Sequence, residues 1–408
     1  MSPFCPACGH AHFFELIDFG SRPVSGVFLS DPADTVTKRR LRFEFCNRCG
    51  LIRQPPIGSS VADYTHVSRP TARQLPHYAP EIIGRLRESV AQGDQLIIEV
   101  GANDGTFLNA LAQAGFSRRL GIEPSQSLST ACEQSGHSML TCHLDADSAI
   151  AIRARHGAAA AVLCRHTLEH VADPAALLRA MAFLLAEDAV LFIEVPDSSP
   201  VVNELRAFEL WDEHLSYFSV SNLRRMLISC GLSAEHMSVV SQRDSRNIVC
   251  WAQKAKHAPC EEQHSDASTL LRHCHQFAER WDGYRRELQQ CASRWSGPVI
   301  AMGASHPQSN FLHFSGIGHL VGGLIDEDPR KIGRWVALPQ PTRVSHPEEL
   351  NAQFGGTLLL TGFGYAEWTQ EMRNRFAHSR VVLVDLFDDS GAARSNCATH
   401  ARNWPIAL

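Results

Sequence analysis

The stretch that decides the fold is QLIIEVGANDGTFLNAL, residues 95–111. Its first six residues form an apolar run that ends at Val100 and has the length of a buried strand. Residues 101–106 (GANDGT) supply a glycine-containing turn, and the run FLNAL that follows is helix-like. This order of strand, glycine turn and helix predicts the first half of a Rossmann-like βαβ unit.

The next strand carries an acid at its carboxyl end. Residues 119–124 (RLGIEP) predict this strand, and Glu123 follows the turn by about 20 residues. A carboxylate at that position can accept hydrogen bonds from both hydroxyls of a ribose. The turn reads E-x-G-x-N-D-G rather than G-x-G-x-x-G, and Asp104 would repel a phosphate. The pattern favours a cofactor with an amine and a sulfonium, S-adenosylmethionine, over a dinucleotide or a purely structural turn.

The alternation of strands and helices continues along the chain. Further strand-like apolar runs lie at residues 139–142, 160–164, 190–196, near 238 and at 247–252. Residues 174–185 predict a helix with one apolar face, and we expect Ser221 to cap another helix that runs to Cys230. The fold class is therefore α/β, with a central doubly wound, Rossmann-like parallel sheet that binds ligands at the carboxyl ends of its strands.

Polar residues follow two of these strands. Asp145 lies just beyond the third strand, where an acid can contact adenine. His166 follows the fourth strand and forms H-x-x-x-H with His170, a spacing that resembles a helical metal pair. The metalloprotease motif has its glutamate at the second position, whereas Glu169 stands at the fourth. We therefore interpret the pair as lining the cofactor site, with His166 as the cofactor-binding residue. A structural role and, least favoured, a metal site are the alternatives.

The segment 211–218 (WDEHLSYF) comes soon after the fifth strand and combines acid, imidazole and aromatic groups. Glu213 and His214 are adjacent in it, and an imidazole titrates near neutral pH. The pair can supply a base and a group that orients or polarises a carbonyl. The alternative is a histidine on a structural turn.

Four cysteines near the N-terminus form two copies of one pattern. CPACG begins at residue 5 and CNRCG at residue 46, so each copy is C-x-x-C followed by glycine. Each tight turn aims two thiolates at one point, and a glycine with positive φ lets backbone N–H groups face the sulfurs. The pattern predicts one structural zinc ion, held by Cys5, Cys8, Cys46 and Cys49. A redox pair or unrelated free thiols are the alternatives.

The last third of the chain repeats the alternation. Residues 261–295 predict one or two connecting helices, and residues 298–302 predict a strand that leads into a turn at 303–305. Further strands are predicted at 320–325, 357–360 and 381–384, and helices at 309–314 and 367–376. This is a second Rossmann-like unit, but its turn lacks the G-x-G-x-x-G spacing, so we expect no second dinucleotide. It can hold a substrate, or pack as a lid or a dimer surface.

The composition is that of a soluble globular protein. The chain has 408 residues, of which 44% are hydrophobic and 20% charged, and this length predicts two or three domains. A formal net charge of −5 gives no electrostatic case for binding nucleic acid. No apolar stretch reaches the roughly 18 residues of a membrane span, and the N-terminus lacks the features of a signal peptide. We therefore expect a cytoplasmic protein with neither a membrane nor a nucleic-acid partner.

These features together resemble the three-domain S-adenosylmethionine-dependent C-methyltransferases of deoxysugar biosynthesis, over nearly the whole chain. The motifs that carry the resemblance are the paired C-x-x-C-G, DFGSRPV (18–24), VGANDGTF (100–107), LEHVADP (168–174), EHLSYFS (213–219), and GAS (303–305) with IDEDP (325–329). The resemblance implies a zinc-binding domain over residues 1–72, a methyltransferase domain over 73–256 and a C-terminal Rossmann-like domain over 257–408.

The resemblance also implies a reaction and its site. Members of this family act on nucleotide-linked 4-keto-deoxyhexoses, whose C3 proton a base removes before the enolate attacks the methyl group. The base of the family falls on His214, with Glu213 beside it, and Tyr64 is the candidate for a tyrosine near the end of the zinc domain. The residues expected at the cofactor are Gly101, Asn103, Asp104, Gly105, Glu123, Asp145 and His166. We expect a monomer or homodimer that binds a small-molecule substrate, in a pathway such as antibiotic biosynthesis.

Three departures from the family pattern concern the acceptor. Trp211 stands where the family usually has tyrosine, and an indole N–H can only donate a hydrogen bond. Pro307 stands where the C-terminal turn often carries lysine, and the double glycine expected before the last central strand is absent near Asp244. The alternatives are a methyltransferase with a different small-molecule acceptor and a metabolite-binding module without catalysis.

Overall fold

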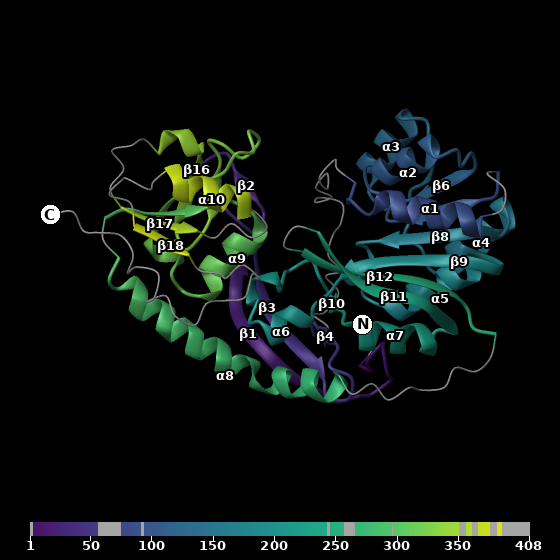
Figure 1. Cartoon of the computed structure of the whole chain (residues 1–408), viewed down its shortest axis with the longest axis horizontal. Coiled ribbons are helices and arrows are strands. Elements are labelled where there is room, and N and C mark those ends of the chain that lie inside the picture. Colours follow the sequence, from purple (N-terminus) through teal and green to yellow (C-terminus); the bar gives the residue numbers. More distant parts are fainter. Residues whose placement is uncertain are drawn as a thin grey trace. The chain divides into compact units, whose positions relative to one another are not determined.

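The computed structural model describes residues 3–55, 75–90, 94–242, 245–256, 266–295, 297–350, 356–360, 366–375 and 382–385. The chain divides into two compact units, and each gathers separate segments of sequence (Figure 1). The first unit comprises Met1–Phe14, Phe45–Asp197 and Glu213–Ser268. The second comprises Glu15–Glu44, Ser198–Asp212 and Thr269–Leu408. The three domains expected at 1–72, 73–256 and 257–408 stay a prediction.

The first unit is built on a sheet of seven strands among the described residues. Their spatial order is β11 (Leu232–Gln242), β12 (Ser245–Lys254), β9 (Leu185–Pro196), β8 (Ala159–Arg165), β5 (Ile97–Val100), β6 (Arg119–Ile122) and β7 (Ser138–Leu140). Strands β5 to β9 pair in parallel, so the Rossmann-like fold predicted from the sequence is confirmed. Strand β12 is antiparallel to both β9 and β11. Only two residues of sequence separate β11 from β12, which is too short a connection to join parallel strands.

Helices cover both faces of this sheet (Figure 1). They are α1 (Ala79–Ser89), α2 (Thr106–Gln113), α3 (Gln126–Gln134), α4 (Ala146–His156), α5 (Pro174–Leu184) and α7 (Val220–Ser229). Side chains alternate along β5, so Ile98 shares one apolar core with residues of α5 and α7. Ile97 faces the other way and shares a core with residues of α1 and α2. The sheet is therefore buried on both faces, as a doubly wound fold requires.

The cap of α7 differs from the sequence expectation. Ser219, not Ser221, is the N-cap: its hydroxyl accepts a hydrogen bond from Asn222 N at 3.4 Å. The Asn222 side chain reciprocates by accepting from Ser219 N at 2.9 Å. Ser219 has the extended backbone that an N-cap needs, whereas Ser221 already lies inside the first turn. The predicted end of the helix is confirmed, with Cys230 as C-cap and Gly231 at a φ of 74°.

The second unit contains another sheet of seven strands within the described part of the chain. Their spatial order is β18 (Val382–Asp385), β17 (Thr357–Leu360), β13 (Val299–Met302), β14 (Val321–Ile325), β16 (Pro341–Ser345), β15 (Trp335–Ala337) and β2 (Phe28–Leu29). The first five pair in parallel, and β15 pairs antiparallel with β16 and β2. The predicted second Rossmann-like unit is confirmed, although β2, β15 and β16 were not predicted.

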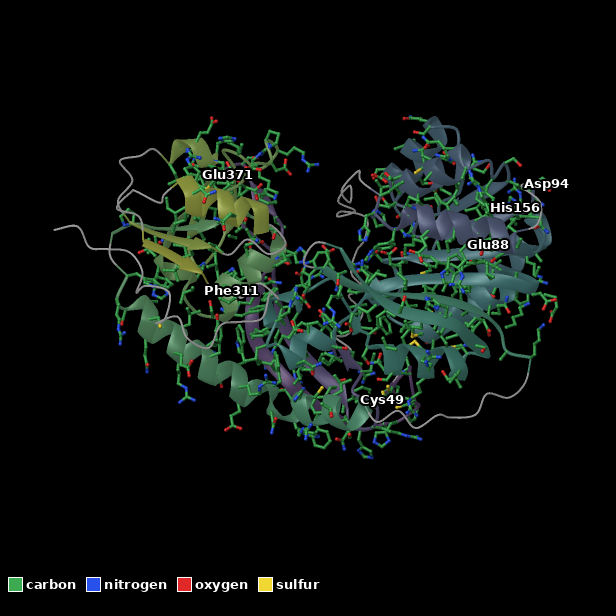
Figure 2. All side chains as sticks on the ribbon, in the orientation of Figure 1. Cys49, Glu88, Asp94, His156, Phe311 and Glu371 are labelled. Carbon is green, nitrogen blue, oxygen red and sulfur yellow. The ribbon has the colours of Figure 1, made fainter. Side chains whose placement is uncertain are left out.

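The helical elements of the second unit are α6 (Ser199–Asn203), η2 (Ala207–Glu209), α8 (Asp266–Ala292), α9 (His306–Phe314), η3 (Gly318–Leu320), η4 (Pro347–Glu349) and α10 (Ala366–Arg375). Phe311 of α9, labelled in Figure 2, is fully buried between the rings of Phe208 and Tyr284. No helix among the described residues is long and apolar enough to cross a membrane.

Four further strands among the described residues complete the fold. Strands β1 (Phe13–Pro23) and β3 (Lys38–Cys46) are neighbours in their sheet. Within the first unit, β4 (Ile52–Arg53) pairs antiparallel with β10 (Ser216–Tyr217). This pairing fixes the backbone that directly follows the segment of Glu213 and His214.

Candidate functional site

The turn between β5 and α2 is built around two glycines in the left-handed region. Gly101 has a φ of 75° and Gly105 a φ of 76°. Gly101 N donates to Ile122 O of the neighbouring strand at 2.8 Å. A Cβ on Gly101 would overlap the hydroxyl oxygen of Thr167, so only glycine fits. The turn is thus a tight backbone cradle at the carboxyl end of the parallel strands, where such folds bind ligands.

Glu123 braces this turn from the end of β6. One carboxylate oxygen accepts from Asn103 N at 3.0 Å, and the other accepts from Ser125 N at 2.9 Å. The side chain is buried, which raises the pKa of Glu123 despite these two backbone N–H groups. The sequence prediction of an acid beside the glycine turn is confirmed in position, while its contact with a cofactor stays a prediction.

Two polar side chains at this turn, one from β5 and one from the turn itself, each keep an oxygen without a partner. Oε2 of Glu99 and Oδ1 of Asn103 are buried without a hydrogen bond to any described residue. Burial raises the pKa of Glu99 to about 8. Buried polar atoms are seldom left unpaired, so orphaned oxygens beside a tight glycine turn are what a bound polar ligand would explain. Asp104 forms a hydrogen bond within the turn, since its carboxylate accepts from Thr106 N at 3.1 Å.

Asp145 lies at the start of α4 and is exposed. Its carboxylate accepts from Ser148 N at 2.8 Å, and the Ser148 hydroxyl accepts in return from Asp145 N. The residue is therefore the N-cap of a helix in a capping box. The adenine contact expected of Asp145 stays a prediction.

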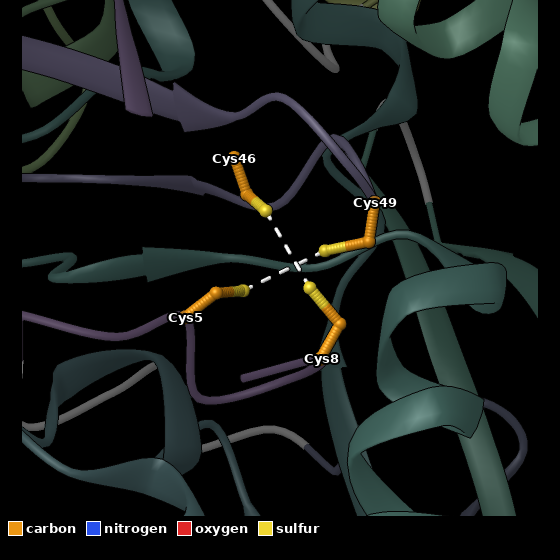
Figure 3. Close-up of side chains that lie close together, drawn as sticks. All are labelled: Cys5, Cys8, Cys46 and Cys49. Atoms are coloured by element: carbon orange, nitrogen blue, oxygen red, sulfur yellow. Dashed lines mark hydrogen bonds between the residues drawn. The ribbon is translucent and has the colours of Figure 1, made fainter. Parts of the chain in front are cut away.

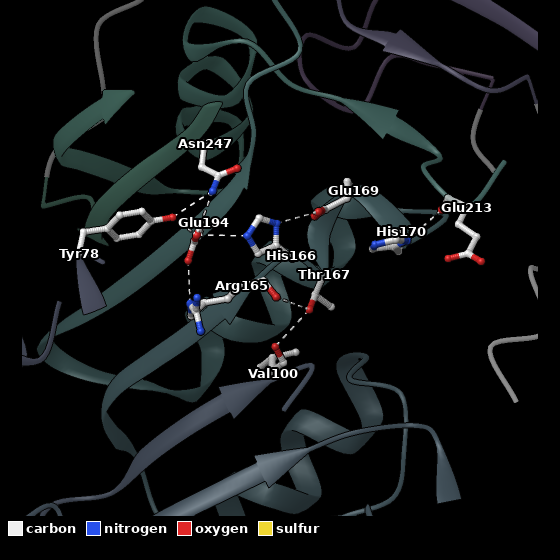
Figure 4. Close-up of polar contacts among 10 residues, drawn as sticks. All are labelled: Tyr78, Val100, Arg165, His166, Thr167, Glu169, His170, Glu194, Glu213 and Asn247. Carbon is white, nitrogen blue, oxygen red and sulfur yellow. Dashed lines mark hydrogen bonds and ion pairs between the residues drawn. The ribbon is translucent and has the colours of Figure 1, made fainter. Parts of the chain in front are cut away.

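His166 lies just after β8 between two carboxylates (Figure 4). Its Nε2 is 3.1 Å from Glu194 Oε1, and its Nδ1 is 3.5 Å from Glu169 Oε1. Desolvation alone would lower the pKa of His166, but the two carboxylates outweigh it and raise the pKa to about 10. The backbone φ of 46° lies in the left-handed region, which is uncommon for a residue other than glycine.

Glu194 organises a network that the sequence reasoning missed (Figure 4). Its buried carboxylate accepts from Arg165 Nε at 2.7 Å, from Asn247 Nδ2 at 3.3 Å and from the hydroxyl of Tyr78. Burial disfavours the carboxylate, yet its cationic and polar partners hold the pKa of Glu194 well below its ordinary value. The available signal was an acid inside the apolar run 190–196, because a buried glutamate needs partners from elsewhere in the chain.

His214 lies opposite His170 across the loop before β10. The ring centroids are 4.7 Å apart and nearly perpendicular. Gln54 Nε2 donates to His214 O at 2.9 Å and thereby holds the loop. Glu213 contacts His170 through its backbone: the Glu213 carbonyl oxygen accepts a hydrogen bond from His170 Nδ1 at 3.0 Å. The structure brings His214 together with His170, a contact that the sequence did not predict. Tyr64 lies outside the described residues.

The four N-terminal cysteines converge on one point in the first unit (Figure 3). Cys5 Sγ is 3.6 Å from Cys49 Sγ, and Cys8 Sγ is 3.5 Å from Cys46 Sγ. A tetrahedral zinc ion with Zn–S bonds of about 2.3 Å places its sulfurs about 3.8 Å apart, so this donor set fits zinc. The two turns are alike: Gly9 and Gly50 both have a φ of 70°.

The sequence is similar to known methyltransferases. Residues 71–237 match the family model described as a methyltransferase domain. The chain is 27% identical over 337 residues to C-methyltransferase NovU from Streptomyces niveus. This likeness covers 77% of the chain and 79% of that protein.

Solved structures also resemble part of the chain. Magnesium protoporphyrin IX methyltransferase from Synechocystis PCC 6803 is 17% identical, with a TM-score of 0.33 over 43% of this chain and 78% of its own. The sugar N-methyltransferase KedS8 from Streptoalloteichus sp ATCC 53650 is 18% identical, with a TM-score of 0.33. The match covers 42% of this chain and 85% of that protein. Scores of this size say nothing about the cofactor or acceptor of this chain.

Proposed function

Because the chain belongs to the family of S-adenosylmethionine-dependent C-methyltransferases, we propose that its acceptor is a nucleotide-linked 4-keto-deoxysugar methylated on carbon. The chain is a methyltransferase rather than a module without catalysis, and its substrate is a small molecule. The choice of this sugar class rests on the sequence motifs that the chain shares with deoxysugar C-methyltransferases.

The cofactor is proposed to bind at the turn after β5. S-Adenosylmethionine, when bound, supplies an electrophilic methyl group on a sulfonium. Glu123 lies where a carboxylate can bind ribose hydroxyls, and its contacts with Asn103 N and Ser125 N fix its orientation. Glu99 and the Asn103 amide offer the buried oxygens that still lack partners among the described residues. An acidic, phosphate-repelling site of this kind suits a cationic cofactor.

His214 is proposed to be the base that makes the acceptor carbon nucleophilic. The ketone acidifies the neighbouring C3–H, and the imidazole nitrogen takes that proton. The electron pair of the broken C–H bond forms the enolate. With S-adenosylmethionine bound, C3 of the enolate would form the new bond to the methyl carbon as the methyl–sulfur bond breaks, and the electron pair of that bond would return to sulfur in the leaving S-adenosylhomocysteine. The observation that carries this assignment is the anchoring of His214, by Gln54 at its carbonyl and by the perpendicular ring of His170.

Hydrogen exchange tests the base directly. The ketosugar is incubated in D2O with the full chain but without cofactor, and deuterium at C3 is measured by NMR. We expect His214→Asn to abolish both exchange and methyl transfer, because no other group then takes the proton. His236→Asn, at an exposed histidine of β11, is the matched control and should leave both rates unchanged. Exchange and transfer that persist in His214→Asn would show that another residue is the base.

A second acceptor class is favoured by one observation in the second unit. The Trp211 indole stacks on His306 with centroids 4.3 Å apart and planes 16° apart. The family usually has a tyrosine at this position, and the indole cannot accept a hydrogen bond as a phenol does. Profiling of a small-molecule extract with methyl-labelled cofactor separates the two classes, since a labelled product that is not a sugar would exclude the ketosugar.

The cysteine site is proposed to hold structural zinc. Four thiolates fill a tetrahedral shell and leave no open position for catalysis. Removing the ion should unfold the chain around the two turns, because metal binding and folding are coupled in such sites. We expect chelator treatment to remove the hydrogen-exchange protection of residues 5–9 and 46–50. Unchanged protection after zinc is shown to be absent would mean that the thiol pairs fold without it.

A further inference from the structure

Glu169 is a buried carboxylate with too few partners. It is 1% exposed, and neither of its oxygens has a hydrogen bond among the described residues. Glu169 forms an ion pair with His166, whose Nδ1 lies 3.5 Å from Oε1, beyond good hydrogen-bond distance. Burying an ionised carboxylate is costly unless it is paired or coordinates a metal. The His166 ion pair reaches only Oε1, so Oε2 of Glu169 stays buried without a partner among the described residues and can take a further cation.

His170 is oriented as metal-binding histidines are. Its Nδ1 lies 3.0 Å from the Glu213 carbonyl oxygen, which can only accept, so Nδ1 carries the proton. A neutral imidazole in that tautomer has its lone pair on Nε2. Metal-ligating histidines commonly donate their other N–H to a backbone carbonyl, which fixes the ring and the tautomer.

The third donor comes from a separate segment that the backbone holds in place. Leu215 N donates to Glu169 O at 2.7 Å, which ties the loop of His214 to the 3-10 turn η1 (Leu168–His170). Gln54 N donates to Leu215 O at 3.1 Å and anchors the same loop from β4. As a result, one ligand atom each from Glu169, His170 and His214 lies within 4.8 Å of the others.

We propose that Glu169, His170 and His214 form a second metal site, which takes a divalent transition ion such as Zn2+ or Co2+. Two imidazoles and one carboxylate suit such ions and leave coordination positions open, whereas Mg2+ and Ca2+ prefer oxygen ligands. The site is distinct from the H-x-x-x-H pair considered in the sequence, since His166 contacts Glu169 but is not a ligand. It also differs from the cysteine site, whose four thiolates are closed to other ligands.

An ion at this site changes what His214 can do. A metal-bound imidazole nitrogen has no lone pair to accept a proton, so the ion would switch off proton abstraction. This consequence rests on the proposed function, in which His214 is the base. The metal site itself does not, because binding is measured without any acceptor.

The test uses the full chain, first loaded with one equivalent of Zn2+ to fill the four-thiolate site, and then titrated with Co2+ alone. We expect one further Co2+ per chain, with visible ligand-field bands and without the charge-transfer band of a Co–thiolate bond. A chain that binds no Co2+ after zinc loading would overturn the proposal, as would bands that arise only from thiolate ligation.

Variants assign the ligands. Glu169→Gln, His170→Asn and His214→Asn should each weaken Co2+ binding by at least about tenfold, because each removes a donor or its charge. Retention of one zinc ion and an unchanged circular dichroism spectrum show that a variant is folded. The matched control is the double variant His10→Asn, His12→Asn. In the unchanged chain, the ring centroids of these two histidines are 5.1 Å apart, so the pair could bind a metal adventitiously. Loss of Co2+ in this control, or its full retention in His170→Asn and Glu169→Gln, would overturn the assignment.

Discussion

The turn after β5 and the turn after β13 have nearly the same backbone but different polar surroundings. Gly101 N donates to the end of β6 at 2.8 Å, and Gly303 N donates to the end of β14 at 2.7 Å. Both glycines have positive φ, and in both units an acid directly follows the next strand. Glu123 accepts from Asn103 N at 3.0 Å, and Asp326 accepts from Ala304 N at 2.9 Å.

The difference lies in what fills each turn. In the second unit, the side chain of Gln308 lies against the turn, because a Cβ on Gly303 would lie 2.8 Å from Gln308 Nε2. Lys331 Nζ also pairs with Asp326 at 2.9 Å. In the first unit, Glu99 and Asn103 keep buried oxygens without partners among the described residues. In the second turn, side chains of the same unit fill the space and pair with the acid. In the first turn, buried oxygens remain that a ligand could hydrogen-bond. The backbone motif alone therefore does not make a cofactor site.

The largest expected difference between the two turns comes from adding one carbon, a Cβ, to the first glycine of each turn. Gly101→Ala should weaken S-adenosylmethionine binding roughly 100-fold, since the Cβ meets Thr167 and the left-handed backbone costs a further ~1–2 kcal/mol. Gly303→Ala carries the same backbone cost but should change this affinity less than about twofold. Calorimetric titration of both folded variants gives the two values.

A rescue variant separates a local clash from general damage. Combining Gly101→Ala with Thr167→Ala removes the colliding hydroxyl and should recover part of the lost affinity. No recovery in the double variant, or equal losses in Gly101→Ala and Gly303→Ala, would remove the distinction between the turns.

The next largest effect concerns pH. Burial raises the pKa of Glu99 to about 8, from an ordinary value of 4.5. The native chain therefore holds one proton more than the unfolded chain between these values, and the free energy of unfolding falls as pH rises through this window. A cationic ligand favours the ionised form, so affinity for S-adenosylmethionine should rise up to about tenfold per pH unit below pH 8. Titrations at several pH values measure both slopes, and Glu99→Gln should flatten them.

The smallest effect compares the two acids. Glu123→Gln keeps the shape of the side chain but removes its charge, and should weaken cofactor binding several-fold. Asp326→Asn should leave cofactor affinity unchanged and instead lower the melting temperature slightly, because it breaks a partly exposed ion pair with Lys331. Equilibrium dialysis and thermal unfolding of both variants distinguish the outcomes. A larger loss of affinity in Asp326→Asn than in Glu123→Gln would contradict the account.

The βαβ units were predictable because their signal is local. The apolar run before Gly101 and the acid at Glu123 lie close in sequence, and buried parallel strands are continuous apolar runs. Strands β15 and β16 were missed because they are short and partly exposed, so they carry no such run. The cap at Ser219 was missed because Ser221 is equally suitable in composition, and only the backbone conformation decides between them.

The candidate site was predictable only in part, because its contacts join distant segments. The cysteine cluster follows from two identical C-x-x-C-G turns, each visible in the sequence. The pairing of His166 with Glu194 spans 28 positions, and the approach of His170 to His214 depends on how η1 meets the loop before β10. Spacing along the chain does not encode these distances, so the sequence alone did not pair His170 with His214.

Hydrogen–deuterium exchange with and without S-adenosylmethionine tests the central claim most directly. The account predicts that the cofactor slows exchange in residues 97–106, which include the turn after β5, and leaves residues 299–308 unchanged. Slowed exchange at the turn after β13, or at neither turn under saturating cofactor, would contradict it.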